Sequence, residues 1–225
     1  MIGVFANTAT IIIGSIIGLL IKKGLSERIA NAMTTATALA VVYIGIDGML
    51  NGENTLILVL SMVIGGVIGT LLNLDGHLES LGNKIENKFS NGNGKIAEGF
   101  VSATLLFCVG AMTIVGSLQS GLSGNHEMLF TKSILDLISS IVLASTLGWG
   151  VMLAAVSVFA IQGSIVLLAQ AVEPFLSTAV ISEMTCAGSV LILALALNML
   201  GITKIKLMNF VPAIFIPIVL CLFMS

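Results

Sequence analysis

The chain has 225 residues, of which 57% are hydrophobic and only 9% are charged, and its formal net charge is -2. A soluble domain carries about 25% charged residues to cover its water-facing surface, so this composition excludes a soluble protein and favours one whose surface faces lipid. The slight negative charge also argues against nucleic acid as a partner, because nucleic-acid-binding domains carry a basic patch.

Eight apolar stretches follow one another, each close to the roughly 20 residues that a helix needs to cross a bilayer. We predict spanning helices at residues 4–21, 31–50, 55–73, 99–119, 131–147, 150–170, 178–200 and 207–224. Residues 132–170 are too many for one span, and Gly148-Trp149-Gly150 is the natural place for a turn. Because continuous apolar runs are typical of spanning helices rather than barrel strands, we expect an all-α, polytopic transmembrane helix bundle that forms a single domain over residues 1–225.

The placement of Lys and Arg predicts the orientation, because these residues are enriched in cytoplasmic connections. With eight helices and an N-terminus outside, only Lys132 of the nine basic residues falls on the outer side. We therefore expect a multi-pass protein of the bacterial cytoplasmic (inner) membrane, with both termini outside. Residues 74–98 would be a cytoplasmic linker, and the helical spacing of its apolar residues predicts an amphipathic helix on the membrane surface.

The first and third predicted spans share a motif, since Ile13–Gly18 closely resembles Ile64–Gly69. Glycines four residues apart let another helix approach closely. The glycines of these two faces are Gly14, Gly18, Gly65 and Gly69. A weaker echo at Gly163–Val166 suggests that the third to fifth spans and the sixth to eighth spans form an inverted repeat, an architecture of secondary transporters. The alternative is that glycine-rich apolar helices resemble one another by composition alone.

The fifth predicted span carries the most informative polar residues. Lys132, Asp136, Ser139 and Ser140 share one helical face. A charge at the bilayer centre costs about 2.5 to 3.5 kcal/mol, so such residues normally face the bundle interior or a water-filled cavity. A carboxylate with several hydroxyl oxygens would suit a hard cation. The alternative is a Lys132–Asp136 pair near the outer interface, with the serines bonded to their own helix.

Polar groups in other spans extend this candidate pathway. Gln162 lies near the middle of its span, where an amide either lines a path or joins two helices. Gln119, Glu183 and Asn198 are further candidates, although Glu183 lies near an outer helix end.

The last predicted span contains Pro212 and Pro217. Each proline removes a backbone donor and kinks or breaks the helix. A broken span exposes helix ends that can bind ions, although prolines are also common in membrane helices without a ligand. We find no hydrolase, kinase, dinucleotide or metal-site motif, and we therefore expect neither enzymatic activity nor a cofactor.

Several segments together resemble the YdfK/YqgA-like bacterial membrane proteins, a domain of unknown function. These segments are Phe107–Met112 with Gly116-Ser117, Lys132–Asp136, Ser139–Val142, Ala144–Gly148, Gln162-Gly163, Glu183-Met184, Leu197-Asn198 and Leu200–Ile202. The resemblance covers nearly the whole chain. It implies an inner-membrane protein of a family sometimes described as a candidate sodium channel or pump. Family members often have an acidic residue after the glutamine of the fourth span, where this chain has Ser120.

These patterns predict a membrane transport protein, either a channel or a secondary transporter, for a small ion such as Na⁺ or H⁺. Two alternatives stay open: a carrier of a small organic solute, and a non-transporting scaffold or assembly factor whose glycine faces bind partner helices. The expected partners are the lipid bilayer and the transported ion or solute, and the chain is also compatible with a homo-oligomer.

Overall fold

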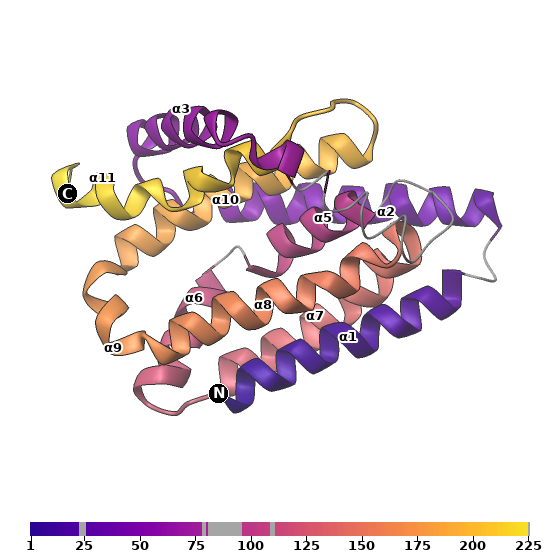
Figure 1. Ribbon diagram of the computed structural model, residues 1–225, viewed down its shortest axis with the longest axis horizontal. Coiled ribbons are helices and arrows are strands. Elements are labelled where there is room, and N and C mark those ends of the chain that lie inside the picture. The colour runs from indigo at the N-terminus through magenta and orange to yellow at the C-terminus, as the bar shows by residue number, and fades with distance from the viewer. Residues whose placement is uncertain (23–25, 78–79, 81–95, 109–110, 225) are drawn as a thin grey trace.

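The computed structural model describes residues 1–22, 26–77, 80, 96–108 and 111–224, and every element in these ranges is a helix (Figure 1). The α-helices are α1 (Ile2–Lys22), α2 (Glu27–Met49), α3 (Thr55–Leu71), α5 (Ile96–Cys108), α6 (Ala111–Leu122), α7 (Glu127–Leu147), α8 (Gly150–Leu167), α9 (Ala169–Val172), α10 (Thr178–Met199) and α11 (Ile216–Met224). Two 3₁₀-helices are η1 (Glu173–Phe175) and η2 (Leu207–Ile214). Most of the predicted surface helix in residues 74–98 lies outside the described residues.

Five helices are long and apolar enough to cross a membrane, namely α1, α2, α7, α8 and α10. The pair α5 and α6 makes a sixth crossing if the two helices count as one span bent by 59°. Two further apolar segments, α3 and Leu207–Phe223, are shorter. The structure thus supports a membrane helix bundle, whereas the prediction of eight full-length spans is not confirmed.

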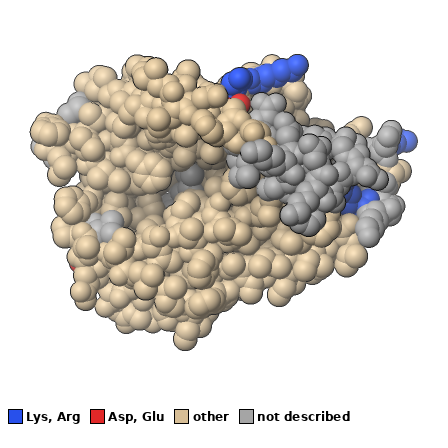
Figure 2. Space-filling view, viewed as in Figure 1, with Lys and Arg blue, Asp and Glu red and all other residues tan. Residues whose placement is uncertain are grey.

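The surface agrees with a lipid environment. Large apolar side chains point outward along the helices, among them Val63 at 58% exposure, Ile134 at 61% and Val156 at 68%. In the face shown in Figure 2, the acidic and basic side chains lie toward the edges and the broad middle carries none. An apolar surface of this extent is typical of a protein surrounded by hydrocarbon rather than by water.

The predicted turn between the fifth and sixth spans lies where the sequence places it. Helix α7 ends at Leu147 and α8 begins at Gly150. Gly148 between them has a φ of 82°, a left-handed conformation that glycine adopts readily and that strains other residues. The glycine therefore allows the chain to reverse within two residues.

Two of the predicted spans are broken. The last one divides into η2 and α11, with Pro212 inside the 3₁₀-helix and Pro217 in the first turn of α11, as expected for residues that cannot donate a backbone hydrogen bond. The fourth was predicted as one helix over residues 99–119 and instead forms α5 and α6. The Thr113 hydroxyl donates to the Phe107 carbonyl oxygen at 3.0 Å and so links the two helices.

The predicted packing glycines lie where helices meet. A Cβ atom on Gly18 would be 2.9 Å from the Cβ of Ala144 in α7, and a Cβ atom on Gly14 would be 2.6 Å from the Leu137 carbonyl oxygen. On α3, a Cβ atom on Gly65 or Gly69 would be 2.6 to 2.8 Å from atoms of η2. Helix α7 runs parallel to α1, whereas η2 runs antiparallel to α3. The two similar motifs thus have different surroundings, and the inverted repeat still rests on the sequence.

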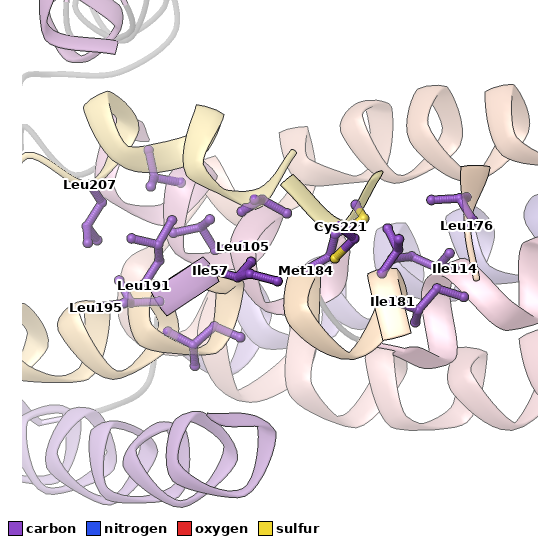
Figure 3. Packing of buried hydrophobic residues seen from close by; sticks show 14 of the residues in the cluster. Ile57, Leu105, Ile114, Leu176, Ile181, Met184, Leu191, Leu195, Leu207 and Cys221 are labelled. Atoms are coloured by element: carbon purple, nitrogen blue, oxygen red, sulfur yellow. The ribbon is translucent and has the colours of Figure 1, made fainter. Parts of the chain in front are cut away.

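Helices α5 and α6 lie between two groups of helices (Figure 1). On one side α10 is the central helix, and 72% of its spanning window is buried; its core includes Leu105 of α5 and Met184 of α10 (Figure 3). On the other side α1, α7 and α8 form a second core that includes Phe107 of α5 and Leu143 of α7. The broken helix pair therefore lies between the two larger hydrophobic cores of the described residues.

Candidate functional site

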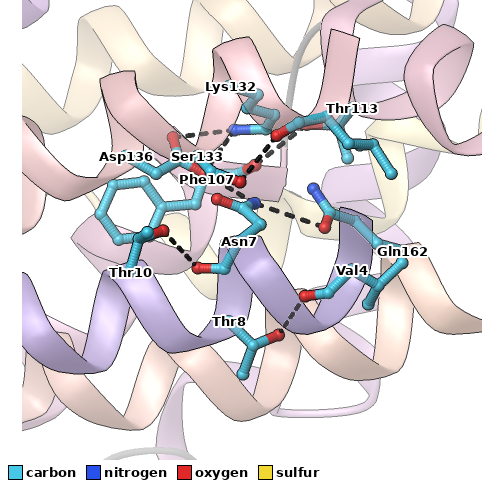
Figure 4. A network of polar contacts seen from close by, with 11 residues as sticks. Val4, Asn7, Thr8, Thr10, Phe107, Thr113, Lys132, Ser133, Asp136 and Gln162 are labelled. Carbon is cyan, nitrogen blue, oxygen red and sulfur yellow. Dashed lines mark hydrogen bonds and ion pairs between the residues drawn. The ribbon is translucent and has the colours of Figure 1, made fainter. Parts of the chain in front are cut away.

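A cluster of buried polar side chains lies where α1, α7 and α8 meet (Figure 4). We call it the polar cluster, and it consists of Asn7, Lys132, Asp136 and Gln162. The Lys132 ammonium lies 2.9 and 2.7 Å from the two carboxylate oxygens of Asp136. The Asn7 amide nitrogen donates to Asp136 Oδ2 at 3.0 Å and to Gln162 Oε1 at 3.3 Å. One asparagine thus connects the ion pair on α7 with the amide on α8.

The polar cluster is well inside the bundle. Asn7 and Gln162 are 0% exposed, and Lys132 and Asp136 are 6% and 5% exposed. Asp136 lies nine residues after the start of α7, which is about 14 Å along the helix at 1.5 Å per residue. The polar face of the fifth predicted span therefore points inward, away from lipid and from the end of the helix, and its carboxylate is paired with Lys132.

Several hydroxyls of α7 donate hydrogen bonds to carbonyl oxygens of their own helix. Ser133 donates to the Leu129 carbonyl at 2.7 Å, Ser140 to Leu137 at 2.9 Å, and Thr146 to Leu143 at 3.0 Å. This is the alternative arrangement that the sequence left open for the serines. Ser140 is also packed against the Gly14 backbone, while Ser139 is half-buried. These hydroxyls use their protons within α7, and their oxygen lone pairs remain available as acceptors.

Two atoms of the polar cluster have no hydrogen-bond partner among the described residues. They are Asn7 Oδ1, which is an acceptor, and Gln162 Nε2, which is a donor. A buried polar atom without a partner costs about 1 to 3 kcal/mol, and its persistence calls for an explanation such as ligand or ion binding. Asn7 Oδ1 adds a neutral oxygen beside the Asp136 carboxylate, so the site contains the oxygen ligands that hard cations prefer.

The break between α5 and α6 lies next to the polar cluster. Figure 4 shows Phe107 and Thr113, which lie on either side of the break, beside Lys132 and Asp136. The ends of a broken helix carry backbone groups that lack intrahelical partners, and such ends form ion sites in transporters. The geometry therefore joins a charged pair and a helix interruption at one place in the bundle.

Two cavities lie along α5, on the side of the helix break away from the polar cluster. The first, which we call the end cleft, has a volume of about 210 Å³ and is lined by Asp75, Glu98, Ser102 and Asn198 together with apolar residues. The second, the inner cavity, measures about 120 Å³, and its lining includes Thr104 and otherwise mainly apolar side chains. Val101 lines both cavities, so they adjoin along one face of α5. The residues of the polar cluster line neither of them.

The structure places the other predicted residues outside the polar cluster. Gln119 is half-buried on α6. The Glu183 carboxylate accepts hydrogen bonds from the backbone N–H groups of Glu53 and Asn54, both at 2.8 Å. It therefore attaches the N-terminal end of α3 to α10. The positive end of the α3 dipole also stabilises the negative charge of this carboxylate.

Asn198 fixes the connection between α10 and η2. Its amide nitrogen donates to the Ile205 carbonyl at 2.8 Å, and its oxygen accepts from the Ile205 N–H at 2.9 Å and from the Thr203 hydroxyl at 2.6 Å. Asn198 also lines the end cleft. Of the seven predicted pathway residues, Asp136 and Gln162 thus come together, through an asparagine that sequence reasoning did not include.

Asn7 was missed because its importance depends on tertiary contacts. Its partners Asp136 and Gln162 are 129 and 155 residues away in the chain. The available signal was an amide inside the first apolar stretch, since such a group needs a partner within the bilayer. The unpartnered hydroxyls of Ser102 and Thr104 were missed for a similar reason, because most membrane-helix hydroxyls bond to their own backbone.

Comparison with known proteins gives the family. The family model described as "Protein of unknown function (DUF554)" matches residues 2–222. The chain is similar to the "Uncharacterized membrane protein YdfK" of Bacillus subtilis (strain 168), with 40% identity over 221 residues that cover 96% of this chain and 94% of that protein. It is also similar to the "Uncharacterized protein YqgA" of Escherichia coli (strain K12), with 28% identity over 219 residues, or 95% and 93% of the two chains.

No solved structure matches the chain. The resemblance found in the sequence is thus confirmed by the family match and by both relatives. The chain belongs to the DUF554 family, and its apolar helices together with the printed name of its Bacillus relative identify it as a membrane protein.

Proposed function

We propose that the protein transports a small cation, such as Na⁺ or H⁺, across the bacterial cytoplasmic membrane, as a channel or a secondary transporter. The observation that carries this proposal is the polar cluster, a buried ion pair with an unpartnered amide oxygen beside a helix break. A buried ion pair often adds little stability compared with apolar residues of the same size. Ionisable groups inside a membrane protein therefore usually serve ion pathways.

The chemistry of the polar cluster favours a cation over an anion. Asp136 supplies the negative charge, and Asn7 supplies an unpartnered amide oxygen, whereas Gln162 Oε1 already accepts a hydrogen bond from Asn7. The Lys132 ammonium neutralises the carboxylate in the conformation described above, as a cation held by the protein itself. A cargo cation that binds Asp136 replaces this ammonium as the partner of the carboxylate, and the unpartnered Asn7 Oδ1 adds a ligand.

The path that we propose follows α5 and α6. Val101, Thr104, Leu105 and Cys108 are spaced at i, i+3, i+4 and i+7 and share one helix face, and all of them line the inner cavity. This face leads from the end cleft to the break, and the break adjoins the polar cluster. The two cavities and the polar cluster would then be successive parts of one route between the two hydrophobic cores.

The directions of the packed helices support eight alternating crossings, of which α3 and the η2–α11 segment are the short ones. Helix α1 runs parallel to α7, and α5 runs parallel to α8, whereas α2 with α10 and α3 with η2 are antiparallel. Eight alternating segments would give these four relations. We propose this topology with both termini outside, as the placement of Lys and Arg indicates. The two broken segments also agree with an inverted-repeat transporter.

The test is cation flux into proteoliposomes that contain the purified protein. Wild type should take up ²²Na⁺ or acidify the lumen down an imposed gradient, and Asp136→Asn should reduce the initial rate at least tenfold. Glu173→Gln, an exposed carboxylate outside the polar cluster, is the matched control and should keep the wild-type rate. Equal rates for wild type and Asp136→Asn, or rates no higher than those of empty liposomes, would overturn the proposal.

A further inference from the structure

The end cleft lies among the ends of several helices. Asp75 follows α3, Glu98 is in the first turn of α5, Asn198 is in the last turn of α10, and Leu207 begins η2. All of these positions are at the end of the bundle opposite to the ends of α1 and α7 that lie near the polar cluster. The cleft therefore adjoins the aqueous side at one membrane surface and leads inward along α5.

The mainly apolar lining of the end cleft includes two carboxylates. Asp75 is half-buried and Glu98 is exposed, and no ion pair of either carboxylate occurs within the described part of the chain. The side chain of Asn198 adds an amide oxygen that already accepts two hydrogen bonds. The two carboxylates come from different helices, so they are brought together by the tertiary fold and not by their sequence spacing.

Ser102 provides an independent observation. It is 0% exposed and lines the end cleft, yet its hydroxyl has no hydrogen-bond partner among the residues described. The serines of α7 bond to carbonyls of their own helix, whereas Ser102 does not. It follows Glu98 by four residues, so the two side chains share one face of α5. A buried hydroxyl that is left without a protein partner in a cavity wall is a ready ligand for an ion or its water.

We infer that the end cleft binds a small inorganic cation that keeps part of its water shell, on its way to the polar cluster. Asp75 and Glu98 attract the cation, and Ser102 contributes a neutral oxygen at the inner end of the cleft. Carboxylate, hydroxyl and water oxygens are the ligands of hard cations. A volume of about 210 Å³ exceeds that of a bare ion and leaves room for water molecules around it.

This inference rests on the proposed function for the destination of the cation, but its test separates the two. The measurements are equilibrium binding of ²²Na⁺ to the purified protein and the Na⁺ dependence of flux. Glu98→Gln combined with Asp75→Asn should raise the concentration for half-maximal binding and flux at least tenfold and leave the maximal flux unchanged. Ser102→Ala, which removes no hydrogen bond, should raise the concentration for half-maximal binding and flux several-fold. Glu127→Gln, which changes the first-turn glutamate of α7, is the control and should change neither quantity.

Each outcome decides one claim. If wild type carries flux but the cleft variants keep the wild-type half-maximal concentration, the inference is overturned and the transport function stands. If wild type binds ²²Na⁺ without flux and the cleft variants lose this binding, the inference stands and the transport function is overturned. If wild type shows no ²²Na⁺ binding and no flux of either Na⁺ or H⁺, both are overturned. Where wild type binds ²²Na⁺, competition by K⁺ or Ca²⁺ in the binding assay identifies the preferred cation.

Discussion

Replacing one or both members of the buried ion pair should separate its structural cost from its function. In Asp136→Asn, the Lys132 ammonium stays at 6% exposure but loses the carboxylate that lies 2.7 Å away. Removing one partner of a buried pair costs about 3 to 5 kcal/mol, because the other charge is left without compensation. The double variant Lys132→Met with Asp136→Leu removes both charges, and replacing such pairs by apolar residues is often neutral or stabilising by about 1 to 4 kcal/mol.

The assay is the free energy of unfolding in detergent micelles, followed by circular dichroism as denaturant is added. We expect Asp136→Asn to be the least stable protein, and the double variant to be at least as stable as wild type. The Asn7 amide loses one of its two acceptors in the double variant, which offsets about 1 kcal/mol of the gain. Equal stability of Asp136→Asn and wild type would refute the buried pairing. A double variant as unstable as Asp136→Asn would refute the claim that the pair is dispensable for folding.

Three further predictions concern the neighbourhood of the site. Asn7→Leu should lower the free energy of unfolding by about 1 to 3 kcal/mol, because Gln162 loses its donor, and should reduce flux, whereas Thr8→Val should preserve flux. Gly18→Ala should lower the thermal midpoint, because overpacking costs about 1 to 3 kcal/mol; Gly163→Ala, where a Cβ atom is 3.8 Å from its nearest neighbour, should maintain or raise it. Glu183→Gln should cost up to about 2 kcal/mol at the N-terminal end of α3 with an unchanged maximal flux.

Local features of the fold could be predicted from the sequence because their causes are local. Gly148 permits the left-handed turn between α7 and α8 whatever surrounds it, and Pro212 interrupts a helix through its own missing donor. The four-residue spacing of Lys132 and Asp136 places them on one face and within reach of each other. The length of each apolar stretch similarly predicted where helices occur.

The parts of the site that depend on which helices meet could not be predicted in the same way. Nothing near Asn7 in the chain indicates that α1 packs against α7, so its bond to Asp136 had no local signal. The role of Glu183 depends on the approach of the α2–α3 connection to α10, a contact across 130 residues. The break between α5 and α6 was also missed, because the stretch is mostly apolar and contains no proline.

We propose that the polar cluster is retained for cation movement and not for folding. The most direct measurement is ²²Na⁺ flux through the double variant Lys132→Met with Asp136→Leu, reconstituted after its unfolding curve has shown that it is folded. We expect a folded protein whose uptake does not exceed that of empty liposomes. Uptake at the wild-type rate through this uncharged bundle would contradict it.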